Sequence, residues 1–138
     1  MVIKFDTESI RLMTIFENLT GVQVRDCLVE EDTVYFLVDE EKIGMAIGKN
    51  GSVVKNVEAA INKTIKLFGF SDDLTKFIKN LIPKATNIKI MNSEDGKKVE
   101  VVVEKSEKPL VIGREGKNLK IIKELLKRNY DVSELVVR

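Results

Sequence analysis

The chain has 138 residues, of which 43% are hydrophobic and 33% charged, with one cysteine and no histidine. This composition excludes an intrachain disulfide and argues against a zinc site and against catalysis by an imidazole. No long apolar run and no signal-peptide pattern is present, so neither a membrane span nor secretion is expected. The lone cysteine, Cys27, favours a reducing, cytoplasmic compartment.

Charge is distributed unevenly along the chain. Residues 1–70 carry a net charge of −3 and residues 71–138 a net charge of +4, which gives +1 in total. This balance is far from the strongly basic composition that is typical of many nucleic-acid-binding domains. Any contact with a polyanion is therefore expected to come from a local patch of basic residues.

The predicted elements follow the same order twice along the chain. A helix, two strands joined as a hairpin, a short helix, a longer helix and a last strand are predicted at 7–19, 22–29, 33–39, 41–47, from 51 onwards and at 64–68. The second set is predicted at 72–82, 86–91, 98–104, 107–112, from 116 onwards and at 133–137. Pro83 is expected to end the helix that Ser71 or Asp72 caps.

The sequence itself repeats with a shift of 65 residues. "IGKNG" (47–51) then falls on "IGREG" (112–116), and "VYFLV" (34–38) falls on "VEVVV" (99–103) without a gap. The chain is therefore predicted to contain one unit written twice, with the first domain at residues 1–70 and the second at 71–138.

The repeated glycine loop does not fit a nucleotide site. A P-loop needs G-x-x-x-x-G-K-[ST] after a strand, whereas only three residues separate Gly44 from Gly48 and Asn50 stands where Ser or Thr would bind magnesium. A dinucleotide-binding G-x-G-x-x-G is also absent. A simple turn between two helices remains an alternative, although glycines at the same two positions of both copies count against it.

The favoured interpretation is a backbone clamp for a single nucleic-acid strand. Glycines lack Cβ, so a sugar-phosphate chain can approach the main chain, and the free N–H groups at the start of a helix attract anions. Neighbouring basic side chains add charge, and apolar side chains could form the floor of a groove. The candidate residues are Ile47, Gly48, Lys49, Asn50, Gly51, Val54 and Lys55 in the first copy, and Ile112, Gly113, Arg114, Glu115, Gly116, Lys117, Leu119 and Lys120 in the second.

"IGKNG" and "IGREG", each between a short and a long helix, resemble the I-G-x-x-G signature of KH domains. The helix and strand that precede the core resemble the type II arrangement. The resemblance implies an α+β fold of two tandem type II KH domains, each α-β-β-α-α-β with a three-stranded sheet packed on helices. In this family the loop holds about four nucleotides of single-stranded RNA or DNA.

Two such units with a short joint resemble archaeal NusA-like proteins. The resemblance implies a non-enzymatic factor of transcription elongation, termination or antitermination that binds the nascent transcript. RNA polymerase is a candidate second partner, and no cofactor, metal, small-molecule substrate or membrane is expected. Two alternatives remain open, namely a ribosome-associated or RNA-processing KH protein and a KH-fold module that binds other proteins.

The two loops differ in charge. The first carries one positive charge, whereas Arg114 and Glu115 make the second neutral, so Glu115 would oppose a phosphate that lies close to it. The helix that follows carries lysines, and Lys117, Lys120 and Lys127 are predicted along one side, with Leu119, Ile122, Leu125 and Leu126 on the other. Such a lysine stripe is either an ordinary solvated face or part of a nucleic-acid surface.

Overall fold

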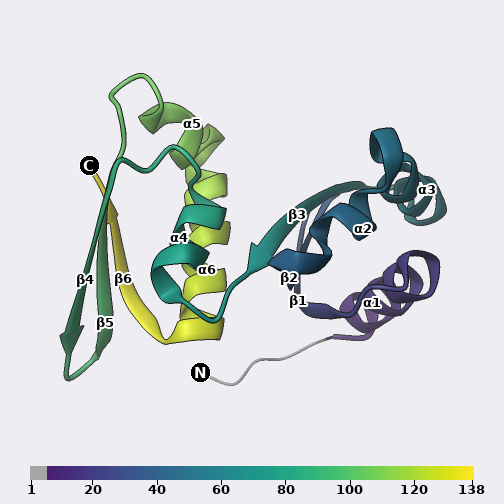
Figure 1. The fold of residues 1–138 in the computed structure, drawn as a ribbon, viewed down its shortest axis with the longest axis horizontal. Coiled ribbons are helices and arrows are strands. Elements are labelled where there is room, and N and C mark those ends of the chain that lie inside the picture. The colour runs from purple at the N-terminus through teal and green to yellow at the C-terminus, as the bar shows by residue number, and fades with distance from the viewer. Residues whose placement is uncertain (1–5) are drawn as a thin grey trace. The chain divides into compact units, whose positions relative to one another are not determined.

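The structure, a computed structural model that describes residues 6–138, divides the chain into two compact units. The first unit ends at Ser71, and the second consists of Asp72–Arg138. Each unit contains one three-stranded sheet and its helices, so the fold is α+β as predicted (Figure 1). Within residues 6–138, no helix has the length and apolar character needed to cross a bilayer.

The first unit has its elements in the predicted order. They are α1 (Thr7–Thr20), β1 (Val24–Glu30), β2 (Thr33–Asp39), the 3-10 turn η1 (Glu40–Lys42), α2 (Ile43–Ile47), the 3-10 turn η2 (Lys49–Gly51), α3 (Ser52–Ile61) and β3 (Thr64–Phe70). The sheet order is β1-β2-β3, with β2 antiparallel to β1 and parallel to β3. The edge strand β3 therefore follows directly from the helix that the glycine loop starts.

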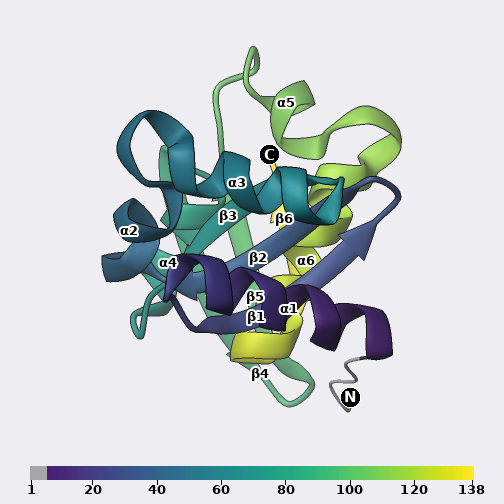
Figure 2. The ribbon, with the colours of Figure 1, turned by 90° about the vertical axis from the view of Figure 1, so that its right-hand side faces the viewer.

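The core of the first unit lies between its sheet and its two longer helices. Figure 2 shows α1 and α3 side by side in front of the strands. On β2, Val34, Phe36 and Val38 are fully buried and share one face, as the two-residue period of a strand requires. The rings of Phe16 and Phe36 have their centroids 4.4 Å apart, which joins α1 to the sheet.

The second unit repeats this arrangement. Its elements are α4 (Leu74–Leu81), β4 (Asn87–Ser93), β5 (Gly96–Val102), α5 (Lys108–Ile112), the 3-10 turn η3 (Arg114–Gly116), α6 (Lys117–Tyr130) and β6 (Val132–Val137). The sheet order is β4-β5-β6, again with an antiparallel and then a parallel pair. Helix α6 buries Ile121, Ile122, Leu125 and Leu126, so its apolar side packs within the unit.

The structure shifts several predicted helix ends by one or two residues, and the start of α4 is the one with an identifiable cause. Helix α4 begins at Leu74 and not at residue 72, because neither Ser71 nor Asp72 caps it. Asp73 is the N-cap and accepts a hydrogen bond from the Thr75 N–H at 2.9 Å. Asp6 caps α1 in the same way, and the hydrogen bond from the Ser9 N–H lowers the pKa of its carboxyl below the ordinary value of an aspartate.

The two units differ in the length of the helix that follows the glycine loop. Helix α3 has 10 residues and α6 has 14, and both end at a left-handed residue, Asn62 and Asp131. The shift of 65 residues therefore applies up to this helix, and one extra turn in α6 changes the register afterwards. The second unit presents a longer helical wall beside its edge strand as a result.

Candidate nucleic-acid interface

The two glycine loops have the same backbone conformation. The first glycine is at φ 76°, ψ 175° in Gly48 and φ 77°, ψ 173° in Gly113. The third loop residue is left-handed in both, at φ 54° in Asn50 and φ 57° in Glu115. Because the last glycines, Gly51 and Gly116, also agree within a few degrees, the two copies present their N–H groups in the same way.

The first glycine of each loop is required by the packing of the protein itself. A Cβ on Gly48 would lie 2.4 Å from Val53 Cγ2 and 2.9 Å from the Val53 backbone nitrogen. A Cβ on Gly113 would lie 2.7 Å from Asn118 Cβ. Asn118 also donates a hydrogen bond to the Val111 carbonyl at 2.9 Å, which ties α6 to α5. The turn interpretation therefore explains this glycine without a ligand.

The second glycine has a different environment. A Cβ on Gly116 would have no atom within 4 Å, and one on Gly51 would make only ordinary contacts with Lys55 and Val54. Packing does not require glycine here, although the positive φ of both residues favours it. The backbone at this point is open to an approaching ligand in both units.

The helices that follow the loops begin without a side-chain cap. Neither α3 nor α6 has an N-cap side chain that accepts from its first turn, although the first N–H of each helix, in Ser52 and Lys117, donates to the carbonyl of Lys49 or Arg114 in the 3-10 turn before it. The intervening side chains Lys49, Asn50, Arg114 and Glu115 are exposed. Open helix N-termini beside basic side chains are suited to a phosphate group.

Glu115 occupies a conformation that suits Asn50 better. Asparagine is one of the few residues other than glycine that adopts the left-handed region readily, whereas glutamate is strained there. The second loop therefore holds an acidic residue in an unfavourable conformation. Strain of this kind is concentrated at functional sites in proteins.

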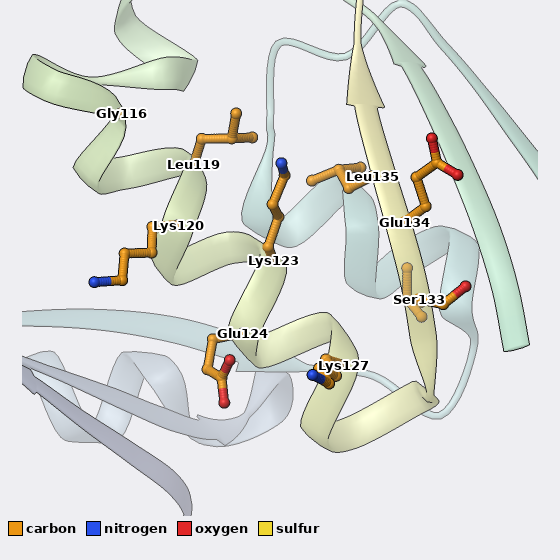
Figure 3. Close-up of a pocket in the computed structure, with 10 residues that line it drawn as sticks. Gly116, Leu119, Lys120, Lys123, Glu124, Lys127, Ser133, Glu134 and Leu135 are labelled. Carbon is orange, nitrogen blue, oxygen red and sulfur yellow. The ribbon is translucent and has the colours of Figure 1, made fainter. Parts of the chain in front are cut away.

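A groove lies beside the second loop, between α6 and β6 (Figure 3). It has a volume of about 440 Å³. The residues that line it are Gly116, Leu119, Lys120, Lys123, Glu124, Lys127, Val132, Ser133, Glu134 and Leu135. Three lysines and two glutamates give this groove a positive balance, and Leu119 and Leu135 supply apolar surface.

Three of the predicted residues of the second copy line this groove, namely Gly116, Leu119 and Lys120. Lys117 does not, and the prediction that Leu119 lies opposite the lysines is wrong, since Leu119 faces the groove with them. The list of candidate residues left out Lys123 and Lys127, although Lys127 was predicted on the same side of the helix as Lys120 and the spacing of three residues places Lys123 there too. Figure 3 shows Lys123 between α6 and β6.

The predicted residues of the first unit gather around its loop. Ile47 is 37% exposed, whereas Val54 is half-buried against the core of the unit. Lys49 and Lys55 are both exposed. A hollow of about 540 Å³ lies farther along α3 and is lined by Asp32, Glu58, Ala59, Asn62, Lys63 and Thr64. Its two acidic groups and single lysine give it the opposite charge balance from the groove of the second unit.

The family models match both units. The KH domain model matches residues 11–71, and the NusA-like second KH domain model matches residues 74–136. The "Probable transcription termination protein NusA" of Methanocaldococcus jannaschii is 31% identical over 98% of this chain and 75% of its own length. The protein of the same name from Thermoplasma acidophilum is 30% identical over 99% and 96%.

A solved structure has the same fold. The crystal structure of APE1850 superposes with a TM-score of 0.80 and 33% sequence identity, covering 97% of this chain and 100% of the other. KH-domain factors of the NusA-like type are non-enzymatic, as expected from the sequence. With two matched KH units and relatives that agree over nearly its whole length, the chain belongs to the NusA-like family of tandem KH-domain proteins.

Proposed function

We propose that this chain binds single-stranded RNA through two G-x-x-G loops and acts on nascent transcripts as a factor of elongation, termination or antitermination. The first KH domain would comprise residues 1–70 and the second residues 71–138. Each loop would hold the sugar-phosphate backbone, with Lys49 and Arg114 beside the phosphates. RNA polymerase is the second partner that such a role would require, in the cytoplasm.

The observation that supports this proposal best is the shared loop conformation. Two loops of different sequence, KN and RE between the glycines, adopt the same left-handed turn in front of an uncapped helix. In each loop the second glycine has no close neighbour that would require it. The left-handed backbone favours glycine at this position and the space beside it is open, so a ligand can approach the backbone there.

Two loops on one chain also compensate for weak single sites. A loop that holds about four nucleotides binds weakly, because few contacts offset the cost of ordering a flexible strand. Once one loop has bound, the tethered second loop is present at a high effective concentration for the same strand. The repeat therefore provides an affinity that neither unit would have alone.

The salt dependence of RNA binding tests the phosphate contacts. We assign phosphate contacts to five of the cationic residues at the loops and in the groove of the second unit, namely Lys49, Arg114, Lys120, Lys123 and Lys127. If all neutralise phosphates, the logarithm of the association constant should fall with the logarithm of salt concentration with a slope of about −3.5, since each contributes about −0.7. Fluorescence anisotropy with a labelled single-stranded RNA measures this slope.

Substitutions show where the slope arises. Lys120→Gln together with Lys123→Gln should make the slope less steep by about 1.4. The matched control, Lys76→Gln with Lys89→Gln, changes two exposed lysines that line neither hollow and should leave it unchanged. A flat salt response of the unmodified chain would contradict RNA binding and favour a protein-interaction module.

Sequencing of the RNA that is crosslinked to the protein in cells tests the role in transcription. Nascent transcripts are expected, and ribosomal RNA would favour a ribosome-associated protein instead.

Glu115→Asn should both stabilise the second unit and tighten RNA binding. Asparagine relieves the left-handed strain, which is worth roughly 1 kcal/mol. The same change removes a negative charge from the loop, so the affinity for RNA should rise severalfold. Urea unfolding and anisotropy measure the two effects, and Asn50→Glu, the reverse change in the first loop, should lower both. If Glu115→Asn weakened binding, the carboxylate would have to contact the RNA favourably.

A further inference from the structure

One N–H group on the free edge of β3 in the first unit, that of Ile65, is bound by a side chain of the same unit. In the sheet, β3 has β2 on one side and no strand on the other, and an edge strand presents unpaired N–H and C=O groups on its free side. The Ile65 N–H donates to Glu58 Oε2 on α3, at 2.8 Å. This donor therefore has a partner within the protein, and Glu58 bridges the space between α3 and β3.

The second unit has lysine at the corresponding position in either register. Counted forward from the glycine loop, Glu58 falls on Lys123, and counted back from the left-handed end of the helix, Glu58 falls on Lys127. Both lysines line the groove between α6 and β6, and a lysine side chain cannot accept a hydrogen bond. An ammonium group at this position attracts a nucleic acid and leaves the strand edge to other acceptors.

One of the two carboxylates that line this groove, that of Glu124, is bound within its own helix. Glu124 Oε1 accepts a hydrogen bond from Arg128 Nε at 3.1 Å, one turn further along α6. The Arg128 side chain is only 14% exposed, so this ion pair is fixed against the protein. Glu124 thus pairs with a residue of its own helix, whereas Glu58 accepts a hydrogen bond from the neighbouring strand β3.

The opposite charge balances of the two hollows support the same distinction between the units. The hollow of the first unit carries Asp32 and Glu58 against Lys63, and the groove of the second carries three lysines against Glu124 and Glu134. A strand of RNA brings one negative charge per nucleotide into whichever space it enters. A strand that passes the loop is therefore favoured between α6 and β6 and disfavoured at the far end of α3, around Glu58 and Asp32.

We propose that the two KH units divide the recognition of RNA. The first unit would hold only the backbone of the strand at its loop, because Glu58 occupies the edge of β3. The second would bind the bases in the groove between α6 and β6, where bases can form hydrogen bonds with the strand edge. This inference rests on the proposed RNA-binding function and assigns Glu58 as the residue that closes the first groove.

Amide chemical shifts in the full chain test the division. The probe is a random-sequence pool of single-stranded RNA of about 12 nucleotides, long enough for two stretches of about four. In a titration followed by 1H–15N correlation spectra, the amides of the glycine loops and of Glu134 and Leu135 should shift. The Ile65 amide should stay in place. An Ile65 shift as large as those of β6 would overturn the proposal.

Glu58 variants provide an affinity test with equal charge. Glu58→Gln removes the charge and keeps an oxygen that can accept from the Ile65 N–H, whereas Glu58→Ala removes both. Glu58→Ala should bind the RNA pool about threefold to tenfold more tightly than Glu58→Gln, which corresponds to one newly available hydrogen bond. In the alanine variant the Ile65 amide should then shift on titration. Equal affinities of the two variants would contradict a closed strand edge.

A third test exchanges the charges of corresponding residues in the two units and measures the affinity for RNA. Glu58→Lys gives the first unit the residue of the second and should raise the affinity above that of Glu94→Lys, a matched control in an exposed turn. Lys123→Glu should lower it. If the unmodified chain bound no RNA, the proposed function itself would fail, whereas binding without these differences would refute only the division between the units. Dispersed spectra establish that each variant is folded.

Discussion

Lys49→Asp combined with Asn50→Asp should weaken RNA binding by roughly ten- to a hundredfold, the equivalent of one lost charge-assisted hydrogen bond. The two changes turn the charge of the first loop from +1 to −2 directly in front of the uncapped N-terminus of α3. Both side chains are exposed, and aspartate tolerates the left-handed conformation of residue 50, so the fold should be retained. Anisotropy and a thermal melt measure affinity and folding on the same sample.

A matched variant separates the loop from the overall charge. Lys105→Asp combined with Ser106→Asp makes the same change of net charge at two exposed residues that precede α5 and line neither hollow. Its affinity should fall by much less than that of the loop variant at physiological salt, where charges beyond about 8 Å are screened. Equal losses in the two variants would mean that the loop has no special role, and unchanged affinity of the folded loop variant would refute the clamp.

The loops could be predicted from the sequence because their determinants are local. A glycine with its neighbours specifies a turn, an amphipathic pattern specifies the helix after it, and a second copy 65 residues later specifies both again. The hairpin and the parallel last strand follow from the order of the elements. For this reason the predicted architecture agrees with the structure, and the errors are confined to element ends such as the cap of α4, which was predicted at Ser71 or Asp72 and lies at Asp73.

The groove could be predicted only in part, because it depends on contacts between distant segments. The residues on α6 repeat with helical spacing, so Lys123 and Lys127 could have been added to Lys120 from the sequence alone. The residues on β6 could not, since only the sheet order places this strand at the edge beside α6. The bond between Glu58 and the Ile65 N–H has no signal in the sequence, where a glutamate on a helix is most simply a solvated residue.

The structure also changes the interpretation of the second loop. By sequence its neutral charge made it the weaker candidate, because Glu115 opposes a phosphate. The groove beside it supplies Lys120, Lys123 and Lys127 against Glu124 and Glu134, whereas the hollow farther along α3 carries Asp32 and Glu58 against Lys63. The first unit thus has a positive loop with acidic residues beside it, and the second has a neutral loop with basic residues beside it. This difference is the basis for assigning the two units different parts of the RNA.

Gly113→Ala should destabilise the second unit by roughly 3–5 kcal/mol, enough to unfold it in a large fraction of molecules. Alanine at φ 77°, ψ 173° is in a region that almost only glycine adopts, and its Cβ would lie 2.7 Å from Asn118 Cβ and 2.9 Å from the Asn118 nitrogen. Neither atom can move without displacing α6. Denaturant unfolding followed by circular dichroism measures the loss, and Gly48→Ala should do the same to the first unit, where Val53 is the residue in the way.

Gly116→Ala is the control that separates packing from ligand approach. Its Cβ would meet no atom within 4 Å, so only the left-handed backbone opposes the change, at a cost of about 1–2 kcal/mol. The second unit should stay folded, but the methyl group would project from the backbone where a phosphate is expected to approach, and RNA affinity should fall severalfold. Since the two glycines are three residues apart in one loop, unfolding by Gly113→Ala and weakened binding by a folded Gly116→Ala would assign them different roles. A folded Gly116→Ala variant with full affinity would leave its glycine explained by the turn alone.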